Sequence, residues 1–223
     1  MKLTRAGTNI VPYRANTMEY ASYMYLWPPR PESKIPVGMT GFYDRKSWTA
    51  QAKLNGTCSV IFANGEQCII KTRHDDDHKA WTPKTEHVEF FKSTAVNGNW
   101  NVFVAELMHN KGPLIKDMLY VFDVLVYQGC QLIGQTFAAR QALLEQIIPG
   151  NETELWYEHS RQIVRARNHT GNSRELYQRI SEIPYVEGLV LKDPNAALGL
   201  CNRKDNNTGW QVKCRKTTKN YGF

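Results

Sequence analysis

The chain has 223 residues, of which 42% are hydrophobic and 22% charged, and its formal net charge is +7 at pH 7. This composition excludes intrinsic disorder and fibrous repeats, and the length is enough for one domain with its own core. No apolar run approaches the roughly 20 residues that span a bilayer, and the N-terminus lacks the apolar segment of a secretory signal. The basic charge favours an acidic partner, most commonly a nucleic acid.

The cysteines are odd in number and show no C-x-x-C pair, which argues against a zinc knuckle or a redox motif. They are Cys58, Cys68, Cys130, Cys201 and Cys214. We expect reduced thiols in a cytoplasmic protein with no membrane partner.

Residues 1–46 are predicted to form an N-terminal lead-in to a single domain that covers residues 1–223. Several prolines favour extended backbone there, and an aromatic cluster is expected to pack through its rings. The cluster consists of Tyr20, Tyr23, Tyr25 and Trp27.

Three strands are predicted over residues 48–54, 57–62 and 66–72. Asn-Gly pairs at 55–56 and 64–65 favour the positive backbone angles of tight hairpin turns. The segment is therefore expected to be an antiparallel meander.

The remaining elements follow from apolar periodicity and turn signals. They are helix 85–94, strand 100–107, strand 120–127, helix 137–148, helix 173–183, strand 185–192 and strand 210–215. Ser173 is expected to cap the last helix. The order favours an α+β fold with mostly antiparallel sheets and flanking helices over a parallel doubly wound sheet.

The candidate chemistry lies in a series of short segments. They are Lys53-Leu-Asn-Gly56, Thr72-Arg73, Val104-Ala-Glu106-Leu107, Val121-Phe122-Asp123-Val124, Glu187-Gly-Leu-Val-Leu-Lys192 and Trp210-Gln-Val-Lys213-Cys-Arg215. Taken alone, Lys53 would be an ordinary surface lysine beside a turn. In this order, the segments from residue 48 to 216 resemble the collinear motifs of the covalent nucleotidyltransferase superfamily. That superfamily contains ATP-dependent DNA ligases, RNA ligases and messenger RNA capping enzymes.

The resemblance implies the ligase nucleotidyltransferase fold, which is ATP-grasp-like, and an adenylylation reaction. Lys53 would attack the α-phosphorus of ATP as a neutral amine and form a lysyl-AMP intermediate. Glu187 would hold Mg²⁺ or Mn²⁺, since these ions prefer carboxylate and phosphate oxygens. The nucleotide-binding residues implied by the motifs are Ala52, Arg73, Glu106, Phe122, Lys192, Lys213 and Arg215.

Their implied roles differ. Arg73 and Glu106 would contact the ribose, Phe122 would stack on adenine, and the three cations in the last two motifs would stabilise the α-phosphate. Outside this context, Glu106 could be an exposed strand carboxylate and Phe122 a core ring.

The motifs depart from the DNA ligase pattern at two positions. DNA ligases usually have aspartate at the position of Asn55 and arginine at that of Cys58, and the first motif is in this respect closer to one branch of RNA ligases. The chain also ends just past the final motif, so no C-terminal oligonucleotide-binding (OB) barrel is expected. This would fit a minimal monomeric enzyme, a truncated chain or a separate duplex-binding partner.

Two further segments carry possible binding groups. His74-Asp-Asp-Asp-His78 has metal-ligand residue types, but five consecutive residues cannot converge on one ion, so a solvated acidic loop is the better reading. The tail from 202 to 219 is basic, and Arg203, Lys204 and Lys216 are candidate contacts for nucleic acid phosphates.

The expected function is ATP-dependent joining of 3′-hydroxyl and 5′-phosphate ends, with DNA nicks slightly favoured. The alternatives are an RNA ligase of the same superfamily, a capping guanylyltransferase, which is less favoured, and a catalytically idle nucleic-acid-binding relative.

Overall fold

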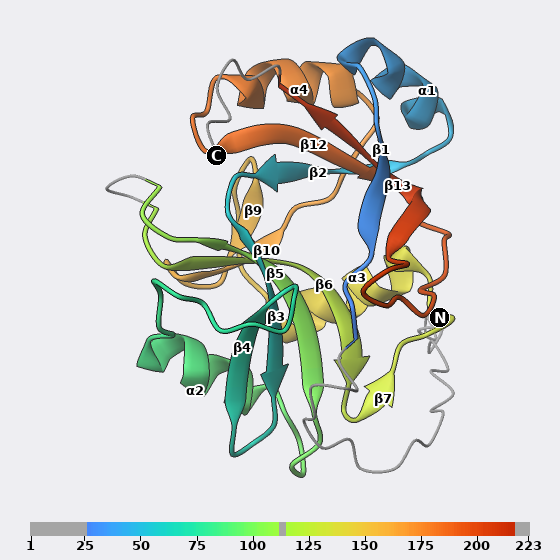
Figure 1. The fold of residues 1–223 in the computed structure, drawn as a ribbon. Helices are drawn as coiled ribbons and strands as arrows, with labels where there is room; N and C mark the ends of the chain where they lie inside the picture. The colour runs from blue at the N-terminus through green and yellow to red at the C-terminus, as the bar shows by residue number, and fades with distance from the viewer. Residues whose placement is uncertain (1–25, 112–114, 217–223) are drawn as a thin grey trace, which may run out of the picture.

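The computed structural model describes residues 26–111 and 115–216 (Figure 1). Three members of the expected aromatic cluster, Tyr20, Tyr23 and Tyr25, lie outside these ranges, as do the last residues of the basic tail. No helix within the two ranges is long and apolar enough to cross a membrane.

Strands dominate the chain. They are β1 (Arg30–Lys34), β2 (Thr49–Leu54), β3 (Thr57–Ala63), β4 (Cys68–Thr72), β5 (Asn101–Met108), β6 (Met118–Tyr127), β7 (Cys130–Gln131), β8 (Asn151–Glu152), β9 (Trp156–Glu158), β10 (Ile163–Ala166), β11 (His169–Thr170), β12 (Val186–Lys192) and β13 (Asn207–Arg215). The helices are the 3₁₀ turn η2 (Val37–Met39), α1 (Thr40–Arg45), α2 (Thr85–Ser93), α3 (Phe137–Ile147) and α4 (Ser173–Ser181).

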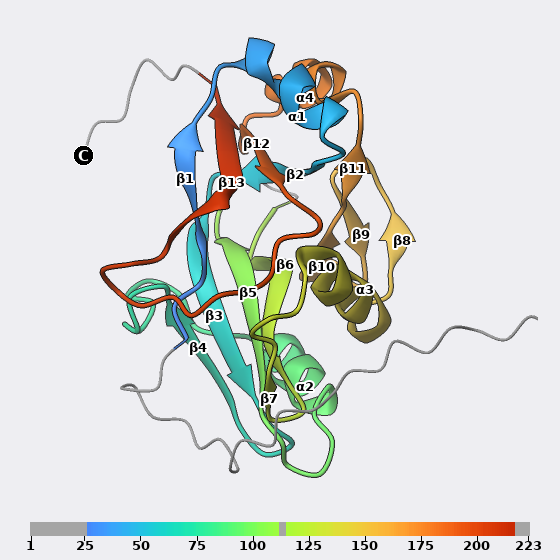
Figure 2. The ribbon, with the colours of Figure 1, turned by 90° about the vertical axis from the view of Figure 1, so that its right-hand side faces the viewer.

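The strands form two sheets. The smaller has the order β1-β13-β12-β2-β11, and the larger has the order β4-β3-β5-β6-β10-β9-β8, with β7 paired to β6. All pairs are antiparallel except β1 with β13 and β10 with β6. α1 and α4 cover the smaller sheet, and α3 packs beside β6 (Figures 1 and 2). The expected α+β fold with mostly antiparallel sheets is confirmed.

The turns around β5 and β6 follow from their sequences. Asn97 and Gly98 before β5 both have positive φ, as do Gln128 and Gly129 between β6 and β7. Between two paired strands, as at residues 128–129, two adjacent positive φ values are typical of the tight turn that matches strand twist. The strands between these turns are almost fully buried and form the centre of one apolar cluster.

The predicted meander is wrong at its first turn. β3 and β4 do form a hairpin, but β2 belongs to the smaller sheet and β3 to the larger. Residues 55–56 therefore carry the chain from one sheet to the other. Gly56 is needed there for a close approach, because a Cβ would lie 2.4 Å from the carbonyl oxygen of Leu107.

Elements were also missed within the expected lead-in. Residues 30–34 form strand β1, which pairs in parallel with β13, and residues 40–45 form α1. Prolines had argued against regular structure there. β1 is an edge strand, where the missing N–H of Pro31 is tolerated. The short strands β8 to β11 were missed as well.

The core consists of two apolar clusters. One lies against the larger sheet, and the other joins the smaller sheet to residues of β5, β6 and β10. Phe122 packs at the margin of both clusters, since its strand runs where the two sheets face each other. The space between the sheets is therefore bounded by rigid strands on both sides.

The start of α4 differs from the predicted cap. Ser173 is fully buried and is the first helical residue, and Asp44 of α1 supplies the acceptor instead. The Asp44 carboxylate accepts from the Ser173 backbone N–H at 3.1 Å and from its hydroxyl at 2.5 Å. A helix N-terminus favours such a negative group, so this contact joins the two helices.

We therefore expect Asp44→Ala to lower the free energy of unfolding by about 1–3 kcal/mol, because two donors of a buried residue lose their acceptor. Asp44→Asn retains an acceptor and should cost less. The measurement is urea unfolding, in which the midpoints are compared between proteins whose m-values agree. Glu66→Ala, an exposed carboxylate in the β3–β4 turn, is the control. Equal midpoints for Asp44→Ala and Glu66→Ala would contradict the role given to Asp44.

Candidate active site

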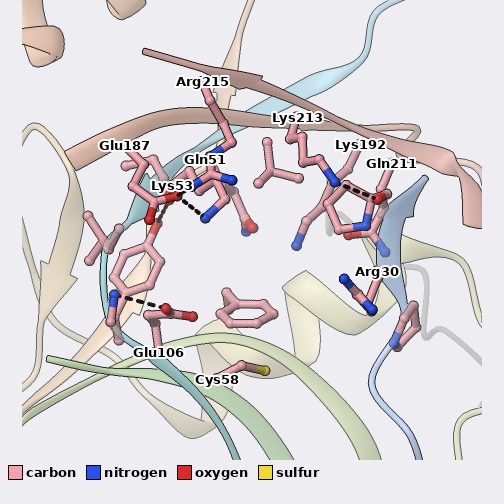
Figure 3. A pocket seen from close by; sticks show the side chains of 18 of the residues that line it. Arg30, Gln51, Lys53, Cys58, Glu106, Glu187, Lys192, Gln211, Lys213 and Arg215 are labelled. Carbon is pink, nitrogen blue, oxygen red and sulfur yellow. Dashed lines mark hydrogen bonds and ion pairs between the residues drawn. The ribbon is translucent and has the colours of Figure 1, made fainter. Parts of the chain in front are cut away.

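A cavity of about 310 Å³ lies between the two sheets (Figure 3). Its walls include every residue predicted from the motifs to be catalytic, nucleotide-binding or metal-binding. These are Ala52, Lys53, Arg73, Glu106, Phe122, Glu187, Lys192, Lys213 and Arg215. Segments more than 160 residues apart in sequence thus meet in one site of ligand size.

The Glu187 carboxylate contacts two basic side chains of the site. Its Oε2 atom accepts from Lys53 Nζ at 2.5 Å and from Arg215 at 3.0 Å. The strand register explains this meeting, since Gly188 of β12 pairs with Lys53 on one side and with Arg215 on the other. The side chain of Glu187 is only 11% exposed, and both cations contact the same carboxylate oxygen.

Gly188 permits this close packing of strands. Its φ is +142°, and a Cβ there would lie 2.0 Å from the Cys214 carbonyl oxygen. The pairing of β12 with β2 is irregular between Val186 and Gly188. In a regular strand, Val190 and Lys192 would share one face and Glu187 would lie on the other. The irregularity allows Glu187 to line the same cavity as Val190 and Lys192.

Glu106 of β5 faces the same space. Its carboxylate accepts from the Gly56 backbone N–H at 3.0 Å, which ties it to the crossing between the sheets. Burial raises the pKa of Glu106 to about 7, with the charge of Glu187 acting in the same direction and that of Lys53 in the opposite one. This carboxylate therefore titrates near neutral pH in the unliganded protein.

Lys192 is buried beneath the cavity, with 3% of its surface exposed. Its Nζ lies 4.9 Å from the ring centroid of Phe122 and 4.7 Å from that of Phe137. Burial lowers the pKa of Lys192 to about 8, although the nearby charge of Asp123 opposes the shift. Asp123 itself is held by two hydrogen bonds from buried Arg140, at 2.9 and 3.0 Å.

β13 presents a row of polar groups to the cavity. Gln211, Lys213 and Arg215 alternate along the strand and all line the space. The pKa of Lys213 is lowered by burial and then by the charges of Arg30 and Arg215. Lys213 Nζ also approaches the Pro31 carbonyl oxygen of β1 at 3.4 Å.

Buried amides fix the orientation of Gln51. Gln141 donates to the Phe122 carbonyl at 3.0 Å, which leaves its side-chain oxygen facing Gln51 and Asn168. Gln51 therefore directs its NH₂ group to Gln141 at 3.1 Å and to Asn168 at 2.8 Å. The oxygen of Gln51 remains as an acceptor beside the cavity that Gln51 lines.

Among the polar residues of the cavity that sequence reasoning missed are Arg30, Gln51 and Gln211. The period of 2 in a strand could have found two of them, since Gln51 precedes Lys53 by two residues and Gln211 precedes Lys213 by two. Arg30 gave no comparable signal, because its strand was not predicted.

The acidic loop does not converge on one point. Asp77 pairs with Lys71 at 2.8 Å, His78 lies 3.1 Å from the Ser59 hydroxyl, and His74 packs edge-on against Trp27. Within residues 26–111 and 115–216, no three His, Cys, Asp or Glu side chains are grouped to hold a metal ion. The acidic groups of the cavity are Glu106 and Glu187.

The candidate nucleic-acid contacts lie outside the cavity and at the two ends of β13. Arg203 and Lys204 are exposed on the connection that precedes the strand. Lys216 follows the strand, and its Nζ donates to the Ile183 carbonyl at 2.9 Å. A strand of this length separates its ends by roughly 30 Å, so the three residues do not form one patch.

Solved structures of DNA ligases share this fold. A mycobacterial DNA ligase D complexed with ATP and MES is 15% identical, with a TM-score of 0.58 over 85% of this chain and 60% of that one. The ligase domain of M. tuberculosis LigD is 16% identical, with a TM-score of 0.55 over 84% of this chain and 60% of that one. The ATP-dependent DNA ligase of bacteriophage T7, in complex with ATP, is 13% identical, with a TM-score of 0.56 over 85% of this chain and 68% of that one. The chain spans about 60% of the length of the first two. No curated protein sequence matches it.

The profile of the ATP-dependent DNA ligase domain matches residues 80–207, which is more than half of the chain. The matched segment contains Glu106, Phe122, Glu187 and Lys192, whereas Lys53 and Arg73 precede it. The fold and the profile agree with the resemblance carried by the motifs. The chain belongs to the ATP-dependent DNA ligase domain family.

Proposed function

We propose that this chain is the nucleotidyltransferase part of an ATP-dependent polynucleotide ligase and that Lys53 is its nucleophile. The contact between Lys53 Nζ and Glu187 Oε2 carries the proposal. It places the one amine that needs activation against a carboxylate, inside a cavity lined by six basic side chains. A site that only bound nucleic acid would not need this pairing.

The proposed chemistry has three steps. The neutral amine of Lys53 attacks the α-phosphorus of ATP, a P–N bond forms, and the α–β anhydride bond breaks with release of pyrophosphate. A 5′-phosphate oxygen then attacks the same phosphorus, and the P–N bond breaks as Lys53 regains a proton. Finally a 3′-hydroxyl attacks the activated 5′-phosphate and displaces AMP, which joins the two strands.

Glu187 supports the first step by positioning the amine. The Glu187 carboxylate contacts Lys53 Nζ and holds it at the wall of the cavity, and the proton that the amine loses before attack is released to solvent. Arg215 keeps the carboxylate on that side of the cavity.

A magnesium ion fits this donor set, because Mg²⁺ is usually bound by one or two carboxylates together with substrate phosphates. Glu187 would hold it. Bound there, the ion would neutralise phosphate charge as the anhydride bond breaks.

The remaining cavity residues suit the other parts of ATP. Phe122 offers a ring for the base, and Lys192 beneath that ring adds positive charge near the phosphates. Glu106, with Arg73 nearby, suits the ribose hydroxyls. The oriented oxygen of Gln51 can accept from the exocyclic amino group of adenine, whereas guanine would present an acceptor of its own. This favours ATP over the GTP that a capping enzyme would use.

We further propose that the nucleic acid is a DNA nick, as the family suggests. Asn55 and Cys58 keep an RNA ligase as the alternative, since they depart from the DNA ligase motif. Arg203, Lys204 and Lys216 would contribute phosphate contacts away from the cavity.

Lys53→Ala and Lys53→Arg should both abolish covalent labelling by α-labelled ATP, because neither side chain offers a neutral amine at pH 7. Labelling is followed on denaturing gels with Mg²⁺, with chelator, and with labelled GTP in parallel. Lys34→Ala, which removes an exposed lysine of β1, is the matched control and should label as the wild type does. Label on either Lys53 variant would remove Lys53 from the mechanism, and no label on the wild type would favour the idle binding protein.

Glu106→Gln should stabilise the unliganded protein at pH 8 but not at pH 5. The folded protein holds the proton of Glu106 up to about pH 7, above the ordinary range for glutamate, so its contribution to stability falls as pH rises from about 4.5 to 7. Glutamine removes that loss, and we expect the free energy of unfolding at pH 8 to rise by about 1–3 kcal/mol. Urea unfolding at both pH values measures it. A difference that does not change with pH would show that Glu106 is ionised throughout.

The double variant Arg203→Ala, Lys204→Ala should weaken nucleic acid binding and reduce the slope of log K against log salt by about 2, since two phosphate contacts are lost. Labelling by ATP should stay unchanged because neither residue lines the cavity. Sealing is compared on nicked DNA, nicked RNA and hybrid duplexes. Preference for RNA ends would favour the RNA ligase alternative, and an unchanged salt slope would exclude these two residues as contacts.

A further inference from the structure

The cavity contains more positive charge than its carboxylates use. Lys53 and Arg215 are paired with Glu187, and Lys192 is buried near Asp123. For Arg30, Arg73 and Lys213, by contrast, the part of the chain that the structure describes provides no ion pair to a carboxylate. Burial and mutual repulsion lower the pKa of Arg30 and of Lys213, so each would gain from a bound anion.

Arg30 enters the cavity from the side of β1 and β13. Figure 3 shows its guanidinium directed into the space, with Gln211 and Lys213 on the same side and Lys53, Glu187 and Glu106 on the opposite side. The parallel pairing of β1 with β13 holds this arrangement, because it brings the Pro31 carbonyl against Lys213 Nζ.

The two sides of the cavity therefore suit different phosphates. The α-phosphorus must lie beside Lys53 to react, so that phosphate belongs to the Glu187 side. Arginine binds phosphate through two parallel N–H donors, and lysine binds it as a point charge. The arginine and the lysine on the far side of the cavity therefore suit a second phosphate.

We propose that Arg30, together with Lys213, forms a subsite for a phosphate group other than the one that bonds to Lys53. Arg73 adds its charge from the end of β4. The group is either the outgoing pyrophosphate of ATP or the 5′-phosphate of the nucleic acid. The choice between these two sources rests on the proposed function, whereas the anion subsite itself does not.

The first experiment needs no catalysis. Binding of inorganic tripolyphosphate to the whole chain is measured by calorimetry for the wild type, Arg30→Ala, Arg30→Lys and Lys34→Ala. We expect Arg30→Ala to weaken binding by about tenfold, because a charge-assisted contact is lost, and Arg30→Lys to weaken it less. Lys34→Ala removes the same charge from the same strand outside the cavity and should bind as the wild type does.

Equal binding by Arg30→Ala and Lys34→Ala would overturn the proposal. Thermal melting of all four proteins shows whether any loss comes from unfolding.

The second experiment identifies the source of the phosphate. Single-turnover rates are measured for labelling by ATP and, with enzyme labelled beforehand, for AMP transfer to a 5′-phosphate. A slower first step in Arg30→Ala assigns the subsite to pyrophosphate, and a slower second step alone assigns it to the nucleic acid. A wild type that takes no label would refute the ligase function, yet its tripolyphosphate binding would still test the subsite.

Discussion

The site depends on one largely buried carboxylate shared by two cations. Glu187 lies on β12, and Lys53 and Arg215 reach it from the strands on either side. A carboxylate that is so little exposed would be costly without partners, so the two contacts add side-chain links between β12 and its neighbours β2 and β13. The same contacts place an amine at the edge of a cationic cavity. One ion-pair network thus links three strands of the smaller sheet and fixes the positions of charged groups in the cavity.

The crossing between the sheets is the second constraint. Gly56 leaves room for the backbone of β5, and its N–H fixes the Glu106 carboxylate. Because this crossing follows Lys53 by only three residues, the Lys53 amine on one sheet and the Glu106 carboxylate on the other have a fixed separation. The rigid cavity can then keep polar groups partly desolvated, which explains why the pKa of Glu106 is raised and that of Lys192 lowered.

The motifs predicted which residues meet in the cavity better than how the strands bring them together. Nine predicted residues line one cavity because each motif combines a strand with a reactive side chain, a pattern that remains visible in sequence. The sheet change at residues 55–56 was not visible, since Asn-Gly is also the usual signal for a hairpin. Arg30 was missed for a similar reason. Its prolines argued against a strand, and only pairing with β13, far away in sequence, makes that segment part of the site.

The most direct test of the central claim is to locate the covalent nucleotide. The wild-type chain is incubated with ATP and Mg²⁺, digested at a pH that preserves phosphoramidates, and mapped by mass spectrometry. We expect an AMP adduct on the peptide that contains Lys53, and loss of that adduct on addition of pyrophosphate, which reverses the first step. An adduct on another residue, such as Lys192 or Lys213, would contradict the account.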